Sequence, residues 1–345
     1  MKIHLAGIWA VGLLNGTALL QAQTYNVTDL GAVSGDNTSV AYGLNSSGQA
    51  AGSSSNPTGG IATLFSGGKA INLGTLEALD VSFAEAVNAL GEVVGYDVLS
   101  STYPSVSHAF LYSNGRMMDI HSASLFPSGT LALGINRSGE VVGYGWINGS
   151  AFHPFLYSGG RMVDLGTLGG TQASAVAIND AGAIVGGSVT AGGIQHAFVY
   201  SSGKMADLGV PPGANYSGAT AINGAGQIAG YIAVNNSSHA ALYSQGVWTD
   251  LGAVAGALGT NATGINDSGQ IVGTAVFQAV YKPFKPARHT GFIVRNGALV
   301  DLDTLIPANS GFTISGASGI NDSGDILCNA KTSSGASHAV LLTPK

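Results

Sequence analysis

Histidine and aspartate recur at a fixed spacing in this chain, and the two residue types together can transfer protons, hold a metal ion or brace a fold. Four histidines each precede an aspartate by 11 residues. A fifth histidine has no aspartate after it, but a matching aspartate lies near the other end of the chain. The five pairs are His108 with Asp119, His153 with Asp164, His196 with Asp207, His239 with Asp250 and His338 with Asp29.

The register of the surrounding segments predicts how the members of a pair meet. A two-residue turn at residues 114–115 sets Phe110 opposite Asp119 on the next strand. Side chains two residues apart share a face of a sheet, so His108 lies diagonally across from Asp119 on that face. A hydrogen bond between them is therefore within reach, and the same arithmetic applies to the other pairs.

The first repeat loses both members of the pair together, since Ile61 and Asn72 stand in their places. If the two residues serve to stabilise the fold by contacting each other, loss of one removes the reason to keep the other, so a structural pair should be lost together. Metal ligands should converge on one ion, whereas these pairs occur once per repeat. We therefore expect the pairs to stabilise the fold, and we assign no catalytic residue, no metal and no cofactor.

A second candidate group lies in residues 275–288, where basic and aromatic side chains alternate. The segment holds three of the chain's 12 basic residues. Rings and cations in this pattern can bind an acidic glycan or an anionic protein surface through stacking and cation–π contacts. The alternative is a solvated loop whose rings only cover the edge of a sheet. The candidate ligand-binding residues are Phe277, Tyr281, Lys282, Phe284, Lys285 and Arg288, joined by Phe312 from the connection that follows.

Carboxylates able to serve a glycan-cleaving enzyme are few. Such enzymes need two carboxyl groups about 5 to 9.5 Å apart. We expect the loops of one rim to supply only Glu77, Asp80, Glu85, Asp97 and Asp303. The sequence has no nucleophile elbow, phosphate-binding loop or zinc motif.

The strands that position these residues can be predicted from an internal repeat in the sequence. A motif of a small residue, an aliphatic residue, Asn, two variable residues and Gly returns at intervals of 43 to 55 residues. Self-similarity at such a period is typical of solenoids and propellers. The asparagine of the motif occurs as Asn45, Asn88, Asn136, Asn179, Asn223, Asn266 and Asn321.

Each repeat contains four segments of strand length, separated by turns that contain glycine. In the third repeat the segments are 130–136, 140–144, 153–158 and 161–165. Four short strands joined by tight turns form one antiparallel sheet, the size of a propeller blade. The small residues before each Asn favour the first strand as the innermost one.

The two ends of the chain distinguish a closed ring from an open solenoid. Seven fourth-strand segments are present, but the first, residues 25–30, precedes any first strand, and the last repeat lacks its own. We predict an all-β, seven-bladed β-propeller of four-stranded blades, closed by this N-terminal strand completing the last blade. The insertions, at 97–107, 275–288 and 303–315, then fall on one rim.

The N-terminal segment and the net charge of the chain indicate where the protein acts. Residues 1–22 carry Lys2 ahead of an apolar run and predict a secretory signal peptide, which leaves 23–345 as a single propeller domain. Removal of Lys2 changes the net charge from −6 to −7, which argues against nucleic acid as a partner. No later run is long enough to span a membrane. We expect a secreted or periplasmic monomer, with Cys328, the only cysteine, as a buried and inert thiol.

The triplets His108-Ala109-Phe110 and His196-Ala197-Phe198, together with the Ile-Asn-x-x-Gly and Asp-Leu-Gly elements, resemble the HAF-repeat family of bacterial extracellular proteins. The resemblance covers nearly the whole mature chain. It implies secretion from a bacterium, but the family has no settled activity that could be assigned to this chain. Departures occur at His153-Pro154-Phe155, His239-Ala240-Ala241, His338-Ala339-Val340, Ile61-Ala62-Thr63 and, in the sixth repeat, His289, which leaves Thr290 in register.

We therefore expect a non-catalytic binding scaffold for an extracellular protein or polysaccharide, which would be bound through one rim of the propeller. Two alternatives from other classes remain. One is a structural component of an envelope or matrix, and the other is a glycan-active hydrolase or lyase.

Overall fold

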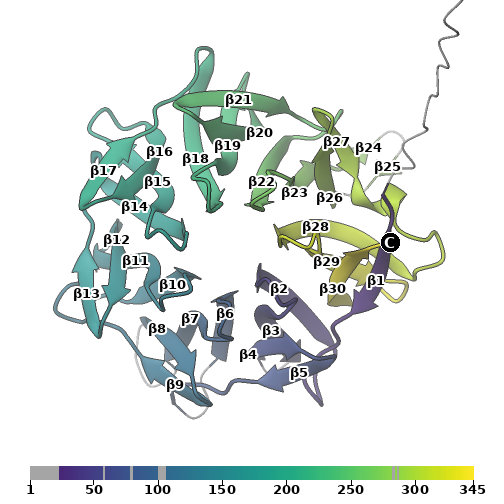
Figure 1. Ribbon diagram of the computed structural model, residues 1–345, viewed down its shortest axis with the longest axis horizontal. Coiled ribbons are helices and arrows are strands. Elements are labelled where there is room, and N and C mark those ends of the chain that lie inside the picture. The colour runs from purple at the N-terminus through teal and green to yellow at the C-terminus, as the bar shows by residue number, and fades with distance from the viewer. Residues whose placement is uncertain (1–22, 57–58, 78–80, 100–105, 282–283, 286) are drawn as a thin grey trace, which may run out of the picture.

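Each sequence repeat folds into an antiparallel unit of four strands. The computed structural model describes residues 23–56, 59–77, 81–99, 106–281, 284–285 and 287–345. These residues form strands and one 3-10 turn, η1 (Leu302–Leu305), with no α-helix in the described ranges. None of the described segments is a helix that could cross a membrane. The units, numbered in chain order, are arranged around a ring with their first strands nearest the centre (Figure 1).

The first four units contain these strands. Unit 1 has β2 (Thr38–Leu44), β3 (Ala50–Asn56), β4 (Gly59–Ser66) and β5 (Lys69–Asn72). Unit 2 has β6 (Val81–Val87), β7 (Val93–Leu99), β8 (Val106–Ser113) and β9 (Arg116–Asp119). Unit 3 has β10 (Thr130–Ile135), β11 (Val141–Asn148), β12 (Ala151–Ser158) and β13 (Arg161–Asp164). Unit 4 has β14 (Gly169–Ile178), β15 (Ile184–Thr190), β16 (Gln195–Ser201) and β17 (Lys204–Asp207).

The remaining three units contain these strands. Unit 5 has β18 (Ala214–Ile222), β19 (Ile228–Val234), β20 (Ser237–Ser244) and β21 (Val247–Gly252). Unit 6 has β22 (Gly259–Ile265), β23 (Ile271–Phe277), β26 (Arg288–Arg295) and β27 (Ala298–Asp301), with the small hairpin β24 (Val280–Tyr281) and β25 (Phe284–Lys285) between its second and third strands. Unit 7 has β28 (Phe312–Ile320), β29 (Ile326–Thr332), β30 (Ser337–Pro344) and β1 (Tyr25–Asp29).

The expectation of separate four-stranded sheets is only partly met. Phe152 of β12 pairs in parallel with Gln172 of β14, which joins units 3 and 4 into one eight-stranded sheet. Ser238 of β20 and Gly259 of β22 join units 5 and 6 in the same way. Each junction is a single pair of residues, made where the third strand of one unit comes beside the first strand of the next.

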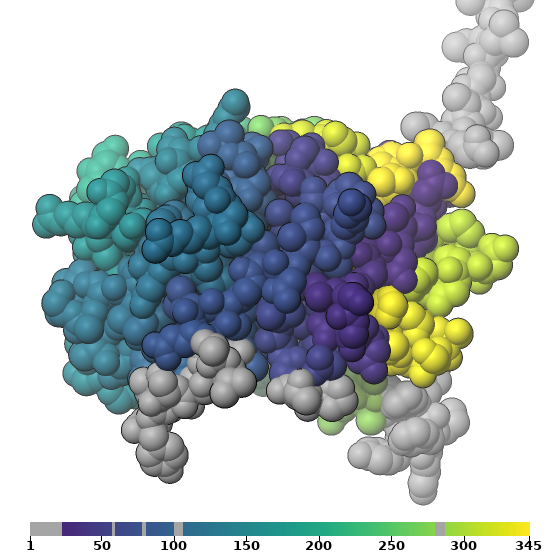
Figure 2. Space-filling view, turned by 90° about the horizontal axis from the view of Figure 1, so that it is seen from below, coloured from purple at the N-terminus to yellow at the C-terminus, as the bar shows by residue number. Residues whose placement is uncertain are grey.

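The two ends of the chain share one sheet. β1 pairs antiparallel with β30, with Tyr25 opposite Pro344 and Asp29 opposite Val340. Tyr25 is fully buried in the core of units 6 and 7. In space-filling view the N-terminal residues, in purple, lie directly beside the C-terminal ones, in yellow (Figure 2). The N-terminal segment therefore supplies the fourth strand that the last repeat lacks.

The repeated asparagines link neighbouring units. Within its own turn, each Asn accepts backbone N–H bonds through its side-chain oxygen, as Asn45 does from Gln49. Its amide nitrogen then donates to the backbone carbonyl of the next unit's Asn, at 2.9 to 3.3 Å. The seventh of these bonds runs from Asn321 back to Asn45. All seven asparagines are buried, so each amide is satisfied inside the protein.

The second strand of a unit carries a glycine because the first strand passes too close for a side chain. A Cβ at Gly95 or Gly186 would collide with a backbone carbonyl of the facing strand. In unit 7 Cys328 takes this place, opposite a first strand with an extra register shift between Ile314 and Gly316. Cys328 is fully buried, and burial raises the pKa of its thiol far above the ordinary value, with Asp303 adding to the effect.

Candidate functional site

All five His–Asp pairs are hydrogen-bonded. The Nδ1 atom of each histidine lies 2.8 or 2.9 Å from a carboxylate oxygen of its aspartate. A carboxylate can only accept, so Nδ1 is the donor. In unit 6 the hydroxyl of Thr290 donates to Asp301 instead, at 3.0 Å, as its register position requires.

Each pair belongs to a network that runs from one unit to the next. The aspartate also accepts the backbone N–H two residues later, as Asp207 does from Gly209 at 2.7 Å. In four of the five pairs an alanine follows the histidine and donates its N–H to a buried hydroxyl of the next unit, as Ala197 does to Ser217 at 2.9 Å; in unit 3 this residue is Pro154, which has no N–H. The Ser217 hydroxyl donates in turn to the carbonyl of Gly209. These contacts engage both members of the pair, and the described residues contain no group of three or more ligands that could hold a metal.

Three residues of the predicted ligand-binding group have described side chains. Phe277 ends β23 and pairs with Arg288 at the start of β26, and the guanidinium carbon lies 3.9 Å from the centre of the ring. Phe312 begins β28 and packs, partly buried, against the core of units 6 and 7. Tyr281, Phe284 and Lys285 lie in β24 and β25, but their side chains are outside what the structure describes, as is the whole of Lys282.

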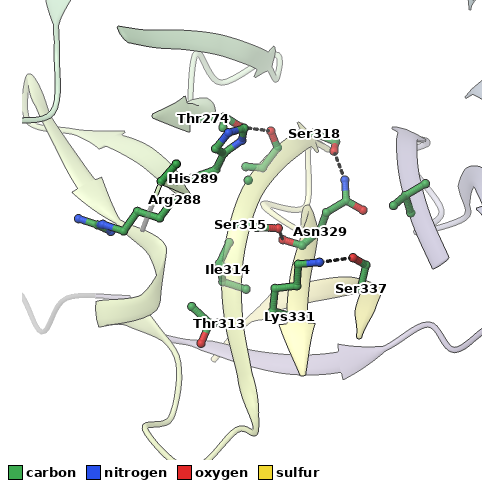
Figure 3. Close-up of a pocket in the computed structure, with 14 residues that line it drawn as sticks. Thr274, Arg288, His289, Thr313, Ile314, Ser315, Ser318, Asn329, Lys331 and Ser337 are labelled. Carbon is green, nitrogen blue, oxygen red and sulfur yellow. Dashed lines mark hydrogen bonds between the residues drawn. The ribbon is translucent and has the colours of Figure 1, made fainter. Parts of the chain in front are cut away.

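A pocket of about 610 Å³ opens beside Arg288, where units 6, 7 and 1 meet. Arg288 and His289 come from β26 on one side, Asn329 and Lys331 from β29 on the other, and residues 313–318 of β28 lie between them (Figure 3). The volume falls within the roughly 300–1,000 Å³ that is typical of small-ligand sites. The lining residues are Val40, Thr274, Ala287, Arg288, His289, Thr313, Ile314, Ser315, Gly316, Ala317, Ser318, Asn329, Lys331 and Ser337.

The pocket is cationic although the chain is acidic overall. Two of the 12 basic residues line it, with His289, and none of the 18 acidic residues does. Arg288, His289 and Lys331 are solvent-exposed, and the Lys331 ammonium donates to Ser337 at 2.7 Å. Asp303 lies nearby: burial raises the pKa of its carboxyl, while a 2.8 Å hydrogen bond from the Ile314 N–H and the charge of Arg288 oppose the rise.

The polar floor of the pocket is fixed by hydrogen bonds. The Asn329 amide bridges both backbone groups of Ala41 in unit 1, at 2.9 and 3.0 Å, and also donates to Ser318. Ser315 donates to the carbonyl of Asn329 at 2.8 Å. These groups are held before any ligand arrives, so a ligand would not bear the entropic cost of ordering them.

The pocket contains residues that the sequence analysis missed, above all Asn329 and Lys331. A signal for one of them was present. Asn329 comes one residue after the second-strand glycine position. In the seven units this next position holds Ser53, Tyr96, Tyr144, Gly187, Tyr231, Thr274 and Asn329. A position that varies this much inside a regular repeat is a candidate for function.

The carboxylates predicted for one rim are scattered. Glu85 lies not in a rim loop but within β6, where a bulge directs it to the central channel. Asp97 is buried within β7 and accepts the N–H of Leu76 at 2.9 Å. Glu77 is exposed, and Asp80 and residues 100–105 are outside the described part of the chain. None of the described rim carboxylates lines the 610 Å³ pocket.

Comparisons with known proteins identify the fold alone. No family model matches the chain. A search of curated proteins finds no match either. The β-propeller domain of the Trilobed protease from Pyrococcus furiosus is similar over 90% of this chain and 95% of that domain, with a TM-score of 0.55 and 9% identity. A puromycin-hydrolyzing peptidase from Mycobacterium tuberculosis gives 0.51 at 14% identity, over 85% of this chain and 48% of that one.

TolB from Acinetobacter baumannii is also similar, with a TM-score of 0.47 and 14% identity over 87% of this chain. The chain spans 64% of the length of that protein. Together with the strands described above, the likeness to the protease domain shows an all-β, propeller-like fold.

Proposed function

We propose that this chain is an exported, closed seven-bladed propeller that acts as a non-catalytic binding scaffold for an acidic polysaccharide. The ligand binds in the cationic pocket between units 6 and 7. The observation that carries the proposal is that pocket, a concave site with Arg288 and Lys331 at opposite edges and no described carboxylate in its lining.

Three observations support the closed ring. The asparagine bonds pass through all seven units and return to the first. β1 completes the sheet of β30, β29 and β28. A cavity at the centre is lined by residues from the first strand of every unit. The proposal that the chain belongs with the HAF-repeat proteins, which would place it outside a bacterial cell, draws on the sequence motifs alone.

The chemistry of the pocket favours an acidic sugar. A guanidinium can hold a carboxylate with two parallel hydrogen bonds, and an ammonium adds a second cationic contact. The hydroxyl of Thr313 and the oxygen atoms of Ser315 and Asn329, which each retain an acceptor lone pair, can bond to the hydroxyl groups of a sugar ring. The guanidinium of Arg288 already lies over the ring of Phe277, so a ligand bears less of the entropic cost of ordering this side chain.

A glycan array with residues 23–345 tests the ligand class. We expect retention on glycans that contain uronic acids and little retention on their neutral counterparts. Raised salt should weaken the binding, because exposed charges are screened. Equal retention on neutral and acidic glycans would overturn the proposal, as would binding only to an acidic protein included on the same array.

A further inference from the structure

The central channel holds a second polar site, distinct from the cationic pocket. Its cavity, about 230 Å³, is lined mainly by glycines and aliphatic side chains of the seven first strands. A β-bulge interrupts each of these strands at the same position. The bulged residues are Tyr42, Glu85, Leu133, Val176, Thr220, Thr263 and Ser318.

Most of the bulge positions have no free polar group. Leu133 and Val176 are apolar. The three hydroxyl side chains donate to backbone carbonyls of the next unit: Thr220 to Ala262 at 2.7 Å, Thr263 to Ala317 at 2.7 Å and Ser318 to Ala41 at 2.9 Å. The polar capacity of the channel is therefore concentrated on the side of units 1 to 3.

Glu85 is the only carboxylate among the residues described as lining this cavity, and no basic side chain lines it. Its side chain forms no hydrogen bond or ion pair with the rest of the described chain. Burial raises the pKa of its carboxyl to about 7. A half-buried carboxylate without a partner is costly when ionised, and a cationic ligand would remove that cost.

The charge of this carboxylate acts on three nearby tyrosines. Tyr42 occupies the equivalent bulge in unit 1, and the strands are so close that a Cβ on Gly43 would lie 2.6 Å from the Cα of Ala86. Tyr96 and Tyr144 follow the second-strand glycines of units 2 and 3. Burial raises the pKa of each phenol, and the charge of Glu85 adds to the rise, which brings Tyr96 to about 12.

The rings are held in place and accessible. Tyr96 stacks on Phe83 with centroids 5.1 Å apart, and Tyr144 packs edge-on against Trp146 at 5.1 Å. Tyr42 is 44% exposed. No hydroxyl group of the three tyrosines is hydrogen-bonded to another described residue. Rings with a nearby carboxylate are the arrangement that recognises ammonium groups through cation–π and Coulomb attraction.

We propose that Glu85, Tyr42, Tyr96 and Tyr144 form a binding site for an organic cation, an alkylammonium group, in the central channel. The site is opposite in charge to the cationic pocket and does not depend on its function. The small cavity limits the ligand to a short ammonium head, with any longer chain extending into solvent through the channel.

Calorimetric titration of residues 23–345 with choline at pH 8 tests the site. We expect binding at one site per chain, and binding at least about tenfold weaker for 3,3-dimethylbutan-1-ol, which has the same shape without the charge. Butylammonium provides a primary ammonium in place of the quaternary one. Failure of both ammonium compounds to bind, or equal binding by the neutral alcohol, would overturn the proposal.

Variants locate the site. Glu85→Gln keeps the shape and removes the charge, so choline affinity should fall about tenfold or more. Glu77→Gln makes the same change on an exposed residue and should leave the affinity within about twofold. Tyr42→Leu, at an exposed ring, provides a second test that leaves the charge intact and should also weaken binding. Unchanged affinity in Glu85→Gln and Tyr42→Leu would contradict the assignment.

The pH dependence follows from the protonation of Glu85, since only the carboxylate attracts the cation. The ionisable groups on which its charge acts, Tyr42, Tyr96 and Tyr144, stay neutral in this range because their pKa values are raised. With a pKa of about 7, choline affinity should fall about tenfold from pH 8 to pH 6. In Glu85→Gln the remaining affinity should not change with pH, and an equal fall in that variant would contradict the role of Glu85.

Discussion

The side-chain amide of Asn321 donates a hydrogen bond to the backbone carbonyl of Asn45, 276 residues earlier in the chain. Six bonds of the same kind connect the other units in order. A single residue type at the first turn of each unit thus performs two tasks. Its oxygen closes the local turn, and its nitrogen fixes the neighbouring unit at a set distance.

Replacement of Asn321 by Ala tests this linkage. The variant leaves the N–H of Ser323 and of Asp325 and the carbonyl of Asn45 without their partner. Each buried group left unsatisfied costs about 1–3 kcal/mol, so the free energy of unfolding should fall by at least about 2 kcal/mol. Denaturant titration measures the loss. Asn148→Ala, at an exposed asparagine, is the control, and equal small losses in the two variants would refute the structural role.

Deletion of residues 24–31 tests the terminal strand. The truncated chain loses the pairing of β1 with β30 and the buried ring of Tyr25. Loss of a buried aromatic side chain alone costs about 3–5 kcal/mol. We expect calorimetry to show one cooperative unfolding transition, with the melting temperature lowered by about 10 °C or more. A chain that begins at residue 23 is the control, and the same melting temperature for both chains would show that the ring does not need this strand.

The His–Asp pairs should contribute to stability and not to ligand binding. His196→Ala and Asp207→Ala should each destabilise the protein, the second more strongly because Asp207 also accepts the N–H of Gly209. The coupling energy from the double-mutant cycle should be about 0.5–1 kcal/mol, since the pair is partly exposed. A coupling energy near zero would leave the recurrence of the pair unexplained.

Glu85→Gln should raise stability at neutral and alkaline pH. In the folded state the pKa of Glu85 is raised from 4.5 to about 7, so the folded protein binds the proton more tightly than the unfolded chain does. That stabilising contribution is present below pH 4.5 and is lost as pH rises through 7. The variant lacks this loss and should be more stable than the parent at pH 8, with a smaller difference at pH 5. Denaturant titrations of both proteins at the two pH values test this, and a difference independent of pH would count against a raised pKa.

The local parts of the fold could be predicted because they follow from short-range geometry. The alternation of a strand and the length of a turn place His108 across from Asp119 without knowledge of the ring. The unpaired first segment identified the partner of β30 in the same way. Such features depend only on residues that are close in sequence, or on a count of equivalent segments.

The pocket and the channel site could not be predicted, because their residues come together only through the arrangement of the units and through β-bulges. Lys331 lies 43 residues after Arg288, and the two line one pocket only because units 6 and 7 are neighbours. Glu85 was expected among the rim carboxylates, but a bulge adds one residue to β6 and places Glu85 in the channel instead. Bulges of this kind leave no clear mark in a hydrophobic pattern, so the channel site was missed.

The most direct measurement of the proposed function is a calorimetric titration of an oligouronate into the double variant Arg288→Gln/Lys331→Met. Its control is Arg116→Gln/Lys204→Met, which makes the same changes at exposed residues of units 2 and 4. Hydrogen bonds to charged groups are worth about 1.5–3 kcal/mol each, so the pocket variant should bind at least about tenfold more weakly than the parent, and the control should match the parent. Equal affinity in all three proteins would contradict the assignment of the ligand to this pocket.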